Sequence, residues 1–107
     1  MGLLASRPSG SAMDIESTIS ENDMVVFATS TCPFCAQAIS RLQQEGFEPK
    51  VIYLDGATRS VLASKTGQTS VPQVFVKSQF IGGCNDGGLG GTLPLLANGT
   101  IKEMMES

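Results

Sequence analysis

This 107-residue sequence predicts an α/β fold, in which helices flank both faces of a four-stranded mixed sheet. Apolar runs of strand length alternate with segments whose apolar residues recur at helical spacing, in the order α-β-α-β-α-β-β-α. The strand–helix–strand start predicts a parallel pair of strands joined by a right-handed crossover. The two consecutive strands near the end add an antiparallel edge. We expect a single domain over residues 13–107, preceded by a mobile leader at residues 1–12 that is rich in Ser, Gly and Pro.

The first two elements are expected within residues 13–28. The segment 13–23 places Ile15 and Ile19 at helical spacing, with acidic residues near its start, which predicts a short amphipathic helix. The sequence MVVFA at 24–28 is continuously apolar. Such a run is typical of a strand that is buried on both faces.

A longer helix is expected over residues 33–45. Ala36, Ile39 and Leu42 recur at helical spacing, so we expect them on its buried face. Gly46 is expected to end the helix, because glycine accepts the left-handed conformation that a helix C-terminus requires.

The middle of the chain repeats the order of strand and helix. Residues 47–55 have the composition of a second strand. Residues 57–67 predict a second long helix that ends at Gly67. Its apolar face is expected to consist of Val61 and Leu62.

The last part of the chain predicts a hairpin and two helical pieces. Residues 71–83 contain two strand-like runs joined by a tight turn at 77–79. Helical pieces are expected at 93–99 and 101–107. Because the glycines before them disfavour a helix, the first is expected to begin late, near Thr92.

The composition excludes several classes of function. With a net charge of −3 and no basic run, the chain has little with which to bind nucleic-acid phosphates. The chain has three cysteines and lacks histidine, which excludes Cys–His catalysis and the Cys₂His₂ and Cys₄ zinc sites. A site of three cysteines and a carboxylate is the unusual alternative, and no metal is expected. No apolar run of about 18 residues is present, so no transmembrane segment is expected. The odd number of cysteines favours reduced thiols and a cytoplasmic location. Gly2 and Ser6 match the loose pattern for N-myristoylation. Targeting to an organelle is a further alternative.

Two cysteines three positions apart, in TCPFC at 31–35, are the clearest chemical signal. Such a pair is a redox centre, part of a zinc site or a small structural disulfide. Cys32 stands between a predicted strand and a predicted helix, and Pro33 suits the first helical position. The Cys32 sulfur should therefore face unpaired N–H groups and the positive end of the helix dipole, which stabilise a thiolate. Cys35, one turn further on, is expected to be less exposed, so we assign Cys32 as the nucleophile and Cys35 as the resolving thiol of a redox-active disulfide.

Two further segments are candidates for substrate binding. A cis peptide bond between Val71 and Pro72 would leave backbone groups of Val71 free to pair with an extended, peptide-like substrate, whereas a trans proline at the start of an edge strand is the alternative. The sequence GGCNDGG at 82–88 is a glycine-rich turn. Its amides, together with Asn85 and Asp86, suit an anion-binding concavity, and a flexible loop is the alternative.

The motifs TSTCPFC, SVPQVF and GGCND, in this order and spacing, resemble those of a dithiol glutaredoxin over roughly residues 14–107. The resemblance implies the thioredoxin fold, a cis bond before Pro72 and glutathione as co-substrate. In that family the first cysteine takes glutathione from a protein–glutathione mixed disulfide, and a second glutathione regenerates the thiol. The second cysteine is needed only for protein disulfides. The partners implied are glutathione and glutathionylated or disulfide-containing proteins, acted on by a monomer.

The resemblance also implies a set of glutathione-binding residues. Val71 corresponds to the backbone that pairs with the cysteine of glutathione, and Asp86 suits its amino group. Arg59 falls near the position that receives the glycine carboxylate, although an arginine on a helix surface is often only solvated. The full set is Thr29, Thr31, Phe34, Arg59, Ser70, Val71, Pro72, Gly83, Cys84, Asn85 and Asp86.

Two positions depart from the family's pattern. Thr29 stands where a lysine is common, and Thr69 stands where an arginine is common, followed by Ser70 in place of threonine. Two cations that would attract glutathione are thus missing. We expect a weaker affinity for glutathione, or a less acidic thiol, than is typical of the family.

Other functions are open at this point. A [2Fe–2S] cluster carrier would share its cluster between two protomers through Cys32 and two glutathiones. Proline after the first cysteine disfavours cluster binding in the family. A thioredoxin proper is disfavoured because the chain has no tryptophan. A non-catalytic module with inert cysteines is the remaining alternative.

Overall fold

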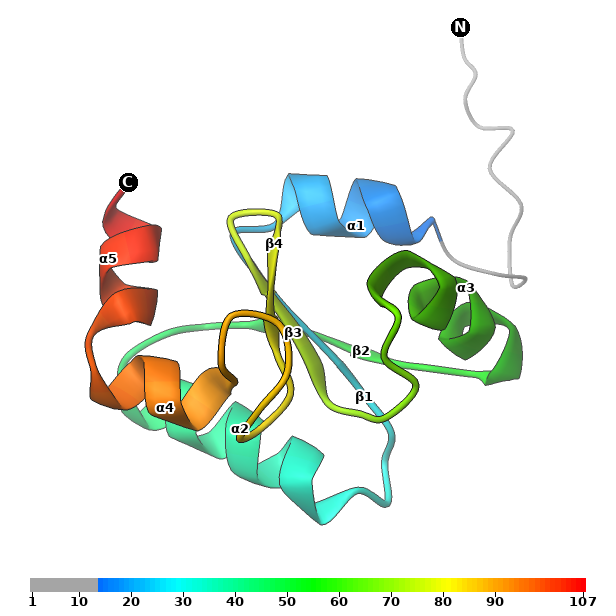
Figure 1. Cartoon of the computed structure of the whole chain (residues 1–107), viewed down its shortest axis with the longest axis horizontal. Helices are drawn as coiled ribbons and strands as arrows, with labels where there is room; N and C mark the ends of the chain where they lie inside the picture. The colour runs from blue at the N-terminus through cyan, green and yellow to red at the C-terminus, as the bar shows by residue number, and fades with distance from the viewer. Residues whose placement is uncertain (1–13) are drawn as a thin grey trace, which may run out of the picture.

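Four strands form one mixed sheet in the order β2-β1-β3-β4 (Figure 1). The structure is a computed structural model that describes residues 14–107, so the predictions for residues 1–12 and for Met13 lie outside the described residues. The strands are β1 (Met24–Ala28), β2 (Lys50–Tyr53), β3 (Gln73–Val76) and β4 (Gln79–Gly82). β1 pairs in parallel with β2 and antiparallel with β3, and β3 pairs antiparallel with β4. The predicted mixed sheet is confirmed.

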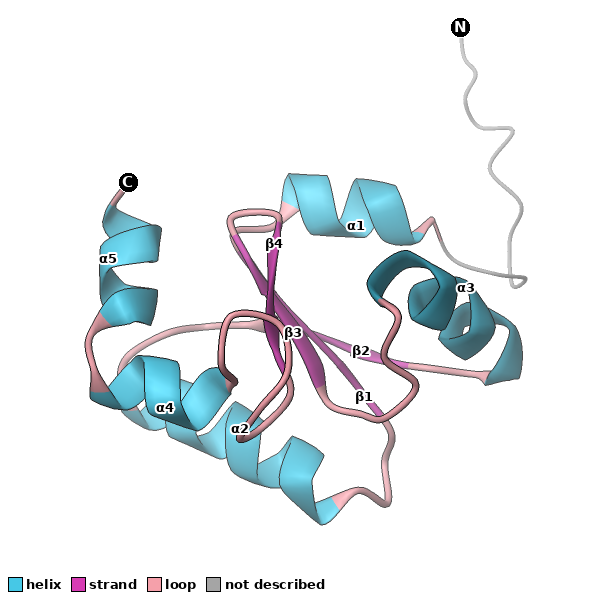
Figure 2. Ribbon diagram, in the orientation of Figure 1, coloured by secondary structure: helices cyan, strands magenta, loops and turns pink. Residues whose placement is uncertain are grey.

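Helices cover both faces of this sheet, as predicted (Figure 2). One face is covered by α1 (Ile15–Glu21) and α3 (Gly56–Thr66), and the other by α2 (Pro33–Gln44), α4 (Thr92–Ala97) and α5 (Thr100–Glu106). This arrangement places the N-terminal end of α2 at the end of β1, where the cysteine pair lies.

Alternating side chains of the sheet fill two separate cores, because successive residues of a strand point to opposite faces. All five residues of β1 are buried, which confirms the prediction from its continuous apolar run. The core under α1 and α3 consists of Ile15, Ile19, Val25, Phe27, Leu62 and Phe75. The core under α2, α4 and α5 is built mainly on Met24, Val26, Leu42, Val74, Ile81 and Ile101.

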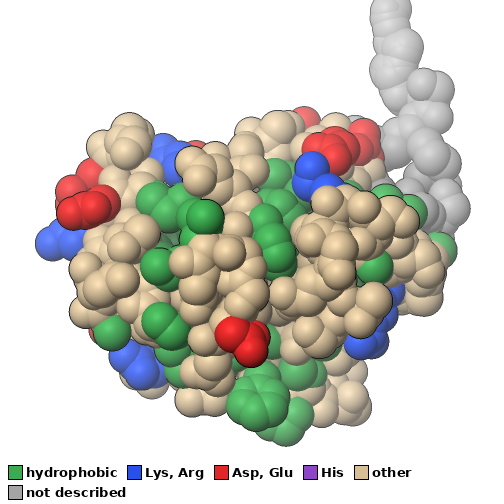
Figure 3. All heavy atoms as spheres, viewed as in Figure 1, with side chains coloured by type: hydrophobic (Ala, Val, Ile, Leu, Met, Phe, Trp, Pro, Cys, Tyr) green, Lys and Arg blue, Asp and Glu red, His purple; other side chains and the backbone are tan. Residues whose placement is uncertain are grey.

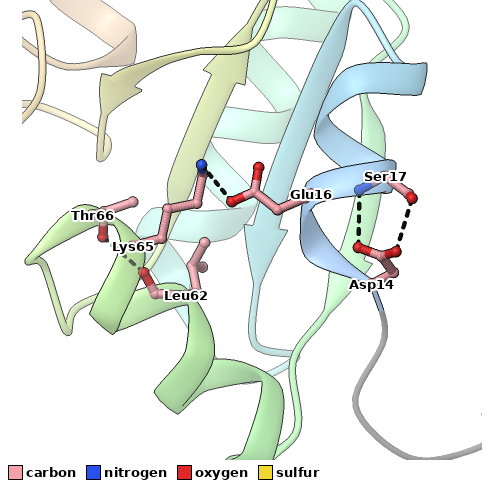
Figure 4. Close-up of polar contacts among 6 residues, drawn as sticks. All are labelled: Asp14, Glu16, Ser17, Leu62, Lys65 and Thr66. Atoms are coloured by element: carbon pink, nitrogen blue, oxygen red, sulfur yellow. Dashed lines mark hydrogen bonds and ion pairs between the residues drawn. The ribbon is translucent and has the colours of Figure 1, made fainter.

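Polar contacts at the surface add to the packing of α1 against α3 (Figure 4). The Lys65 Nζ lies 2.7 Å from the Glu16 Oε2, and so links the two helices. The N-terminus of α1 is capped by Asp14, whose carboxylate accepts the N–H of Ser17 at 3.1 Å. An exposed ion pair of this kind contributes little, about 0–1 kcal/mol, so the two buried isoleucines of α1 carry most of its attachment.

Three details of the sequence prediction were wrong. The second strand covers Lys50–Tyr53 rather than 47–55, because Pro49 has no N–H to donate to the ladder with β1 and Asp55 caps the start of α3. Val61 is 49% exposed and only Leu62 of that pair is buried. Ala36 is also exposed, and Ala38 takes its place on the buried face of α2. Both errors have the same geometric cause, because each residue of a helix is rotated by about 100° from the one before it. Val61 therefore points away from the side that Leu62 occupies, and Ala36 away from the side that Ala38 occupies.

The remaining boundaries follow the predictions closely. The β3–β4 turn is formed by Lys77 and Ser78, with φ values of 51° and 69° that match a two-residue hairpin of the type I′ kind. α4 begins at Thr92, as predicted, and Gly99 separates it from α5 with a φ of 84°. Among the described residues, no helix has the length and apolar character needed to cross a bilayer.

Candidate active site

Cys32 caps the N-terminus of α2 with its own sulfur. Its backbone is extended, Pro33 follows in the first turn, and the N–H of Cys35 donates to the Cys32 Sγ at 3.1 Å. A hydrogen bond donated to sulfur at the positive end of a helix stabilises negative charge on that sulfur. The predicted position of Cys32 at the start of this helix is confirmed, and its side chain is half-buried rather than enclosed.

Cys35 differs strongly from Cys32 in its surroundings. Its side chain is only 1% exposed. Burial, followed by the hydrogen bond with Cys32, raises the pKa of the Cys35 thiol to about 12 from an ordinary value of 9.0. The charge of Cys32 raises this pKa further, whereas a backbone hydrogen bond from Thr29 and the charge of Arg59 oppose the rise. Cys35 therefore keeps its proton near neutral pH as long as Cys32 is not bound in a disulfide.

The loop before β3 faces the Cys32 sulfur. The peptide bond between Val71 and Pro72 is cis, as the resemblance implied. The Val71 carbonyl oxygen lies 3.8 Å from the Cys32 Sγ, at the limit for a hydrogen bond from a thiol. The backbone of this loop therefore lies next to the Cys32 sulfur, although Cys32 is not itself among the residues that line the cleft described below.

The glycine-rich segment forms a tightly folded loop that packs against the start of α4. The N–H of Gly83 donates to the Asp86 carbonyl at 2.7 Å, and the Gly83 carbonyl accepts the N–H of Thr92 at 2.8 Å. A Cβ atom on Gly91 would lie 2.4 Å from backbone atoms of Asn85 and Asp86, and its φ is +100°. Backbone hydrogen bonds and close approach thus hold the loop against the start of α4, which disfavours the flexible-loop alternative.

A cleft of about 240 Å³ lies between these two loops. Eight of the eleven residues in the set implied by the resemblance line it, together with one further residue, Gln68. Its lining is Phe34, Gln68, Ser70, Val71, Pro72, Gly83, Cys84, Asn85 and Asp86. The sole charged side chain of this lining belongs to Asp86. On the face drawn in Figure 3, the basic side chains of the described residues lie apart from one another.

Three residues of the implied set do not line this cleft. Thr29 contributes its carbonyl, which accepts the N–H of Cys32 at 3.4 Å. Thr31 is exposed. Arg59 is exposed on α3, and its Nη2 donates to the Thr69 carbonyl at 3.4 Å, so its positive charge lies beside the loop that precedes β3.

Gln68 is the cleft residue that the sequence analysis missed. Its Nε2 donates to the Ser70 carbonyl at 3.2 Å, and its Oε1 would lie 2.5 Å from a Cβ atom on Gly87. The side chain therefore spans from one loop to the other. No sequence signal marks it, because its position depends on how two segments far apart in the chain approach each other.

Cys84 lines the cleft but is 5% exposed. Its thiol donates to the Gln37 Oε1 at 3.9 Å. Burial raises the pKa of the Cys84 thiol, and the nearby charges of Cys32 and Asp86 raise it further. All three cysteines are free thiols, and residues 14–107 contain no group of three or more His, Cys, Asp or Glu side chains placed to hold a metal ion.

Comparison with known proteins agrees with this geometry. The glutaredoxin family model matches residues 24–81. The chain is 33% identical over 96 residues to glutaredoxin-1 of Rhizophagus irregularis, a match that covers 85% of this chain and 90% of that protein. It is 40% identical over 74 residues to glutaredoxin-C6 of Oryza sativa, covering 64% of this chain and 66% of that one.

Solved structures show the same similarity. Oxidized glutaredoxin 2 from Chlamydomonas reinhardtii superposes with a TM-score of 0.74 at 28% identity, covering 86% of this chain and 87% of that one. The buckwheat glutaredoxin–glutathione complex superposes with a TM-score of 0.73 at 26% identity, covering 85% and 83%. The mixed sheet and helices described above are therefore shared with proteins of known structure.

Proposed function

Because the chain belongs to the glutaredoxin family and is a glutathione-dependent oxidoreductase, we propose that it reduces protein–glutathione mixed disulfides through Cys32. The observation that carries this proposal is the hydrogen bond of 3.1 Å from the Cys35 N–H to the Cys32 Sγ, at the start of α2. It supports negative charge on the one thiol of the pair that is half-open to solvent.

The first step transfers glutathione to the enzyme. The Cys32 thiolate attacks the glutathione sulfur of the mixed disulfide, a bond forms between these two sulfurs, and the substrate protein leaves as a thiolate. No oxidant or reductant is consumed in this exchange. The backbone of Val71 and the amides of the glycine-rich loop are proposed to receive the peptide-like glutathione, with Asp86 opposite its amino group.

The second step regenerates the thiolate. A free glutathione thiolate attacks the glutathione sulfur bound to Cys32, so that glutathione disulfide forms and the Cys32 thiolate leaves. One glutathione thiol is oxidised for each protein thiol restored, and it leaves as glutathione disulfide together with the glutathionyl group that arrived on the substrate. Cys35 takes no part in this route, which fits a thiol whose pKa is raised to about 12.

Protein disulfides are proposed to use both cysteines. After Cys32 has attacked, its sulfur is bound in a mixed disulfide and carries no charge. Two of the effects that raise the Cys35 pKa, the hydrogen bond and the charge of Cys32, are then removed. Cys35 becomes more acidic when it is needed, and its thiolate attacks the Cys32 sulfur to form the Cys32–Cys35 disulfide and release the reduced protein.

A glutathione-coupled assay with a glutathionylated peptide tests the proposal on the wild type, Cys32→Ser and Cys35→Ser. We expect Cys32→Ser to lose turnover and Cys35→Ser to retain most of it. On a protein disulfide, both variants should be inactive. Full activity of Cys32→Ser on the peptide would rule out its role as the nucleophile.

A further inference from the structure

Gln73 is a buried polar residue on the side of the sheet that faces away from the thiols. It begins β3 directly after Pro72 and is 2% exposed. Because side chains alternate along a strand, Gln73 points to the same face as Phe75, toward α1 and α3. Burial of an amide is unfavourable unless its N–H and C=O groups find partners.

The Gln73 amide finds its partners in the segment that joins α3 to β3. Its Nε2 donates to the Gln68 carbonyl at 2.5 Å and to the Ser70 carbonyl at 3.1 Å. Its Oε1 accepts the hydroxyl of Thr66 at 2.8 Å. The Thr66 hydroxyl in turn accepts the N–H of Gln68 at 3.1 Å. Thr66 lies in the last turn of α3 (Figure 4), so the amide links a helix, a loop and a strand.

The same segment forms one wall of the cleft on its other side. Gln68, Ser70 and Val71 all line the cleft, and the Val71 carbonyl lies 3.8 Å from the Cys32 Sγ. The Ser70 carbonyl accepts hydrogen bonds from two amides, that of Gln68 at 3.2 Å and that of Gln73 at 3.1 Å. Gln73 therefore fixes the backbone of this segment from the side opposite the cleft, through its hydrogen bonds to the Gln68 and Ser70 carbonyls.

We propose that Gln73 is a positioning residue for glutathione binding, which fixes the Gln68–Val71 backbone relative to Cys32. This inference rests on the proposed function, since it concerns the binding of glutathione in the same cleft. Gln73 touches neither the thiol nor the cleft. Its loss should therefore weaken binding of the peptide-like substrate and leave the reactivity of Cys32 unchanged.

The variant Gln73→Met keeps the length of the side chain and removes its amide. We expect the KM for a glutathionylated peptide to rise about tenfold, because misplacement of binding groups by a fraction of an ångström is costly, while kcat stays within about twofold. The alkylation rate of Cys32 by iodoacetamide should also stay within about twofold. Phe75→Leu is the matched control, because it removes buried volume on the same face, two residues further along β3, where the Phe75 ring packs against Phe27 and Phe80.

An equal rise in KM for Phe75→Leu, or an unchanged KM for Gln73→Met, would overturn the inference. If Gln73→Met does not fold, Thr66→Val removes the hydroxyl at the other end of the network. It should raise KM about threefold, and an unchanged KM would again overturn the inference. Amide hydrogen exchange at Gln68, whose N–H donates to the Thr66 hydroxyl within the same network, gives a readout independent of turnover. It should speed up about tenfold in Gln73→Met and not in Phe75→Leu, even if the wild type proves inactive and the proposed function fails.

Discussion

Alkylation of the reduced protein across a range of pH separates the two thiols of the CPFC motif by their chemistry. The Cys35 pKa of about 12 lies three units above the ordinary value of 9.0. Near pH 8 its thiolate fraction is therefore about 10⁻⁴, against about 10⁻¹ for an ordinary thiol. The more basic thiolate is intrinsically more reactive by about 15- to 30-fold, so the net rate should be about 30- to 60-fold below that of free cysteine. Burial of the side chain slows the reaction further.

Initial rates of iodoacetamide reaction, read for each cysteine by peptide mass spectrometry, measure this directly. The Cys35 rate should rise about tenfold for each pH unit from about pH 7 to pH 10, because the thiol is still protonated throughout, whereas free cysteine levels off above about pH 9. The same protein unfolded in urea is the control, and there Cys35 should behave as free cysteine does. A Cys35 rate in the folded protein that levels off near pH 9, or that equals the free-cysteine rate near pH 8, would show that the Cys35 pKa is not raised.

Two further predictions concern the loop and the charge beside the cleft. Gly99→Ala should cost only the strain of a left-handed backbone, about 1–2 kcal/mol in the free energy of unfolding, because no atom lies within 4 Å of the added Cβ. Gly91→Ala should lower the free energy of unfolding by about 1–3 kcal/mol more than Gly99→Ala does, because its Cβ meets the backbone of Asn85 and Asp86. It should also raise the KM for glutathione. Equal losses of stability for the two variants in urea unfolding would contradict the close packing of the loop. Arg59→Ala should raise the KM for glutathione about threefold in low salt and less than twofold near 1 M salt. An effect independent of salt would show that Arg59 acts by packing and not by charge.

The sheet and most of its helices could be predicted because their signals are local. The apolar run of β1 indicates a strand buried on both faces, and Ile15 and Ile19 indicate the buried face of α1, as the structure confirms. The errors at Ala36 and Val61 arise where a helix carries apolar residues around more than one side. Spacing alone does not say which of these residues meet the sheet, since that depends on how each helix packs in three dimensions.

The candidate site was predicted only in part, for a related reason. Cys32 and Pro33 carry a local helix-start signal, which the capping geometry confirms. Gln68 and Gln73 look like ordinary polar residues in the sequence, and they gain their significance from hydrogen bonds within the loop that joins α3 to β3. The resemblance to the family identified most of the cleft, but it did not identify the residues that hold it in place.

Locating the glutathione adduct on the chain tests whether Cys32 is the nucleophile that accepts glutathione. Cys35→Ser is incubated with glutathione disulfide, digested without reduction and analysed by mass spectrometry. We expect one glutathione per chain, on the peptide that contains Cys32, and none on Cys84, whose thiol is buried with a raised pKa. Glutathione found on Cys84, or no adduct on Cys32 under conditions that modify free cysteine, would contradict it.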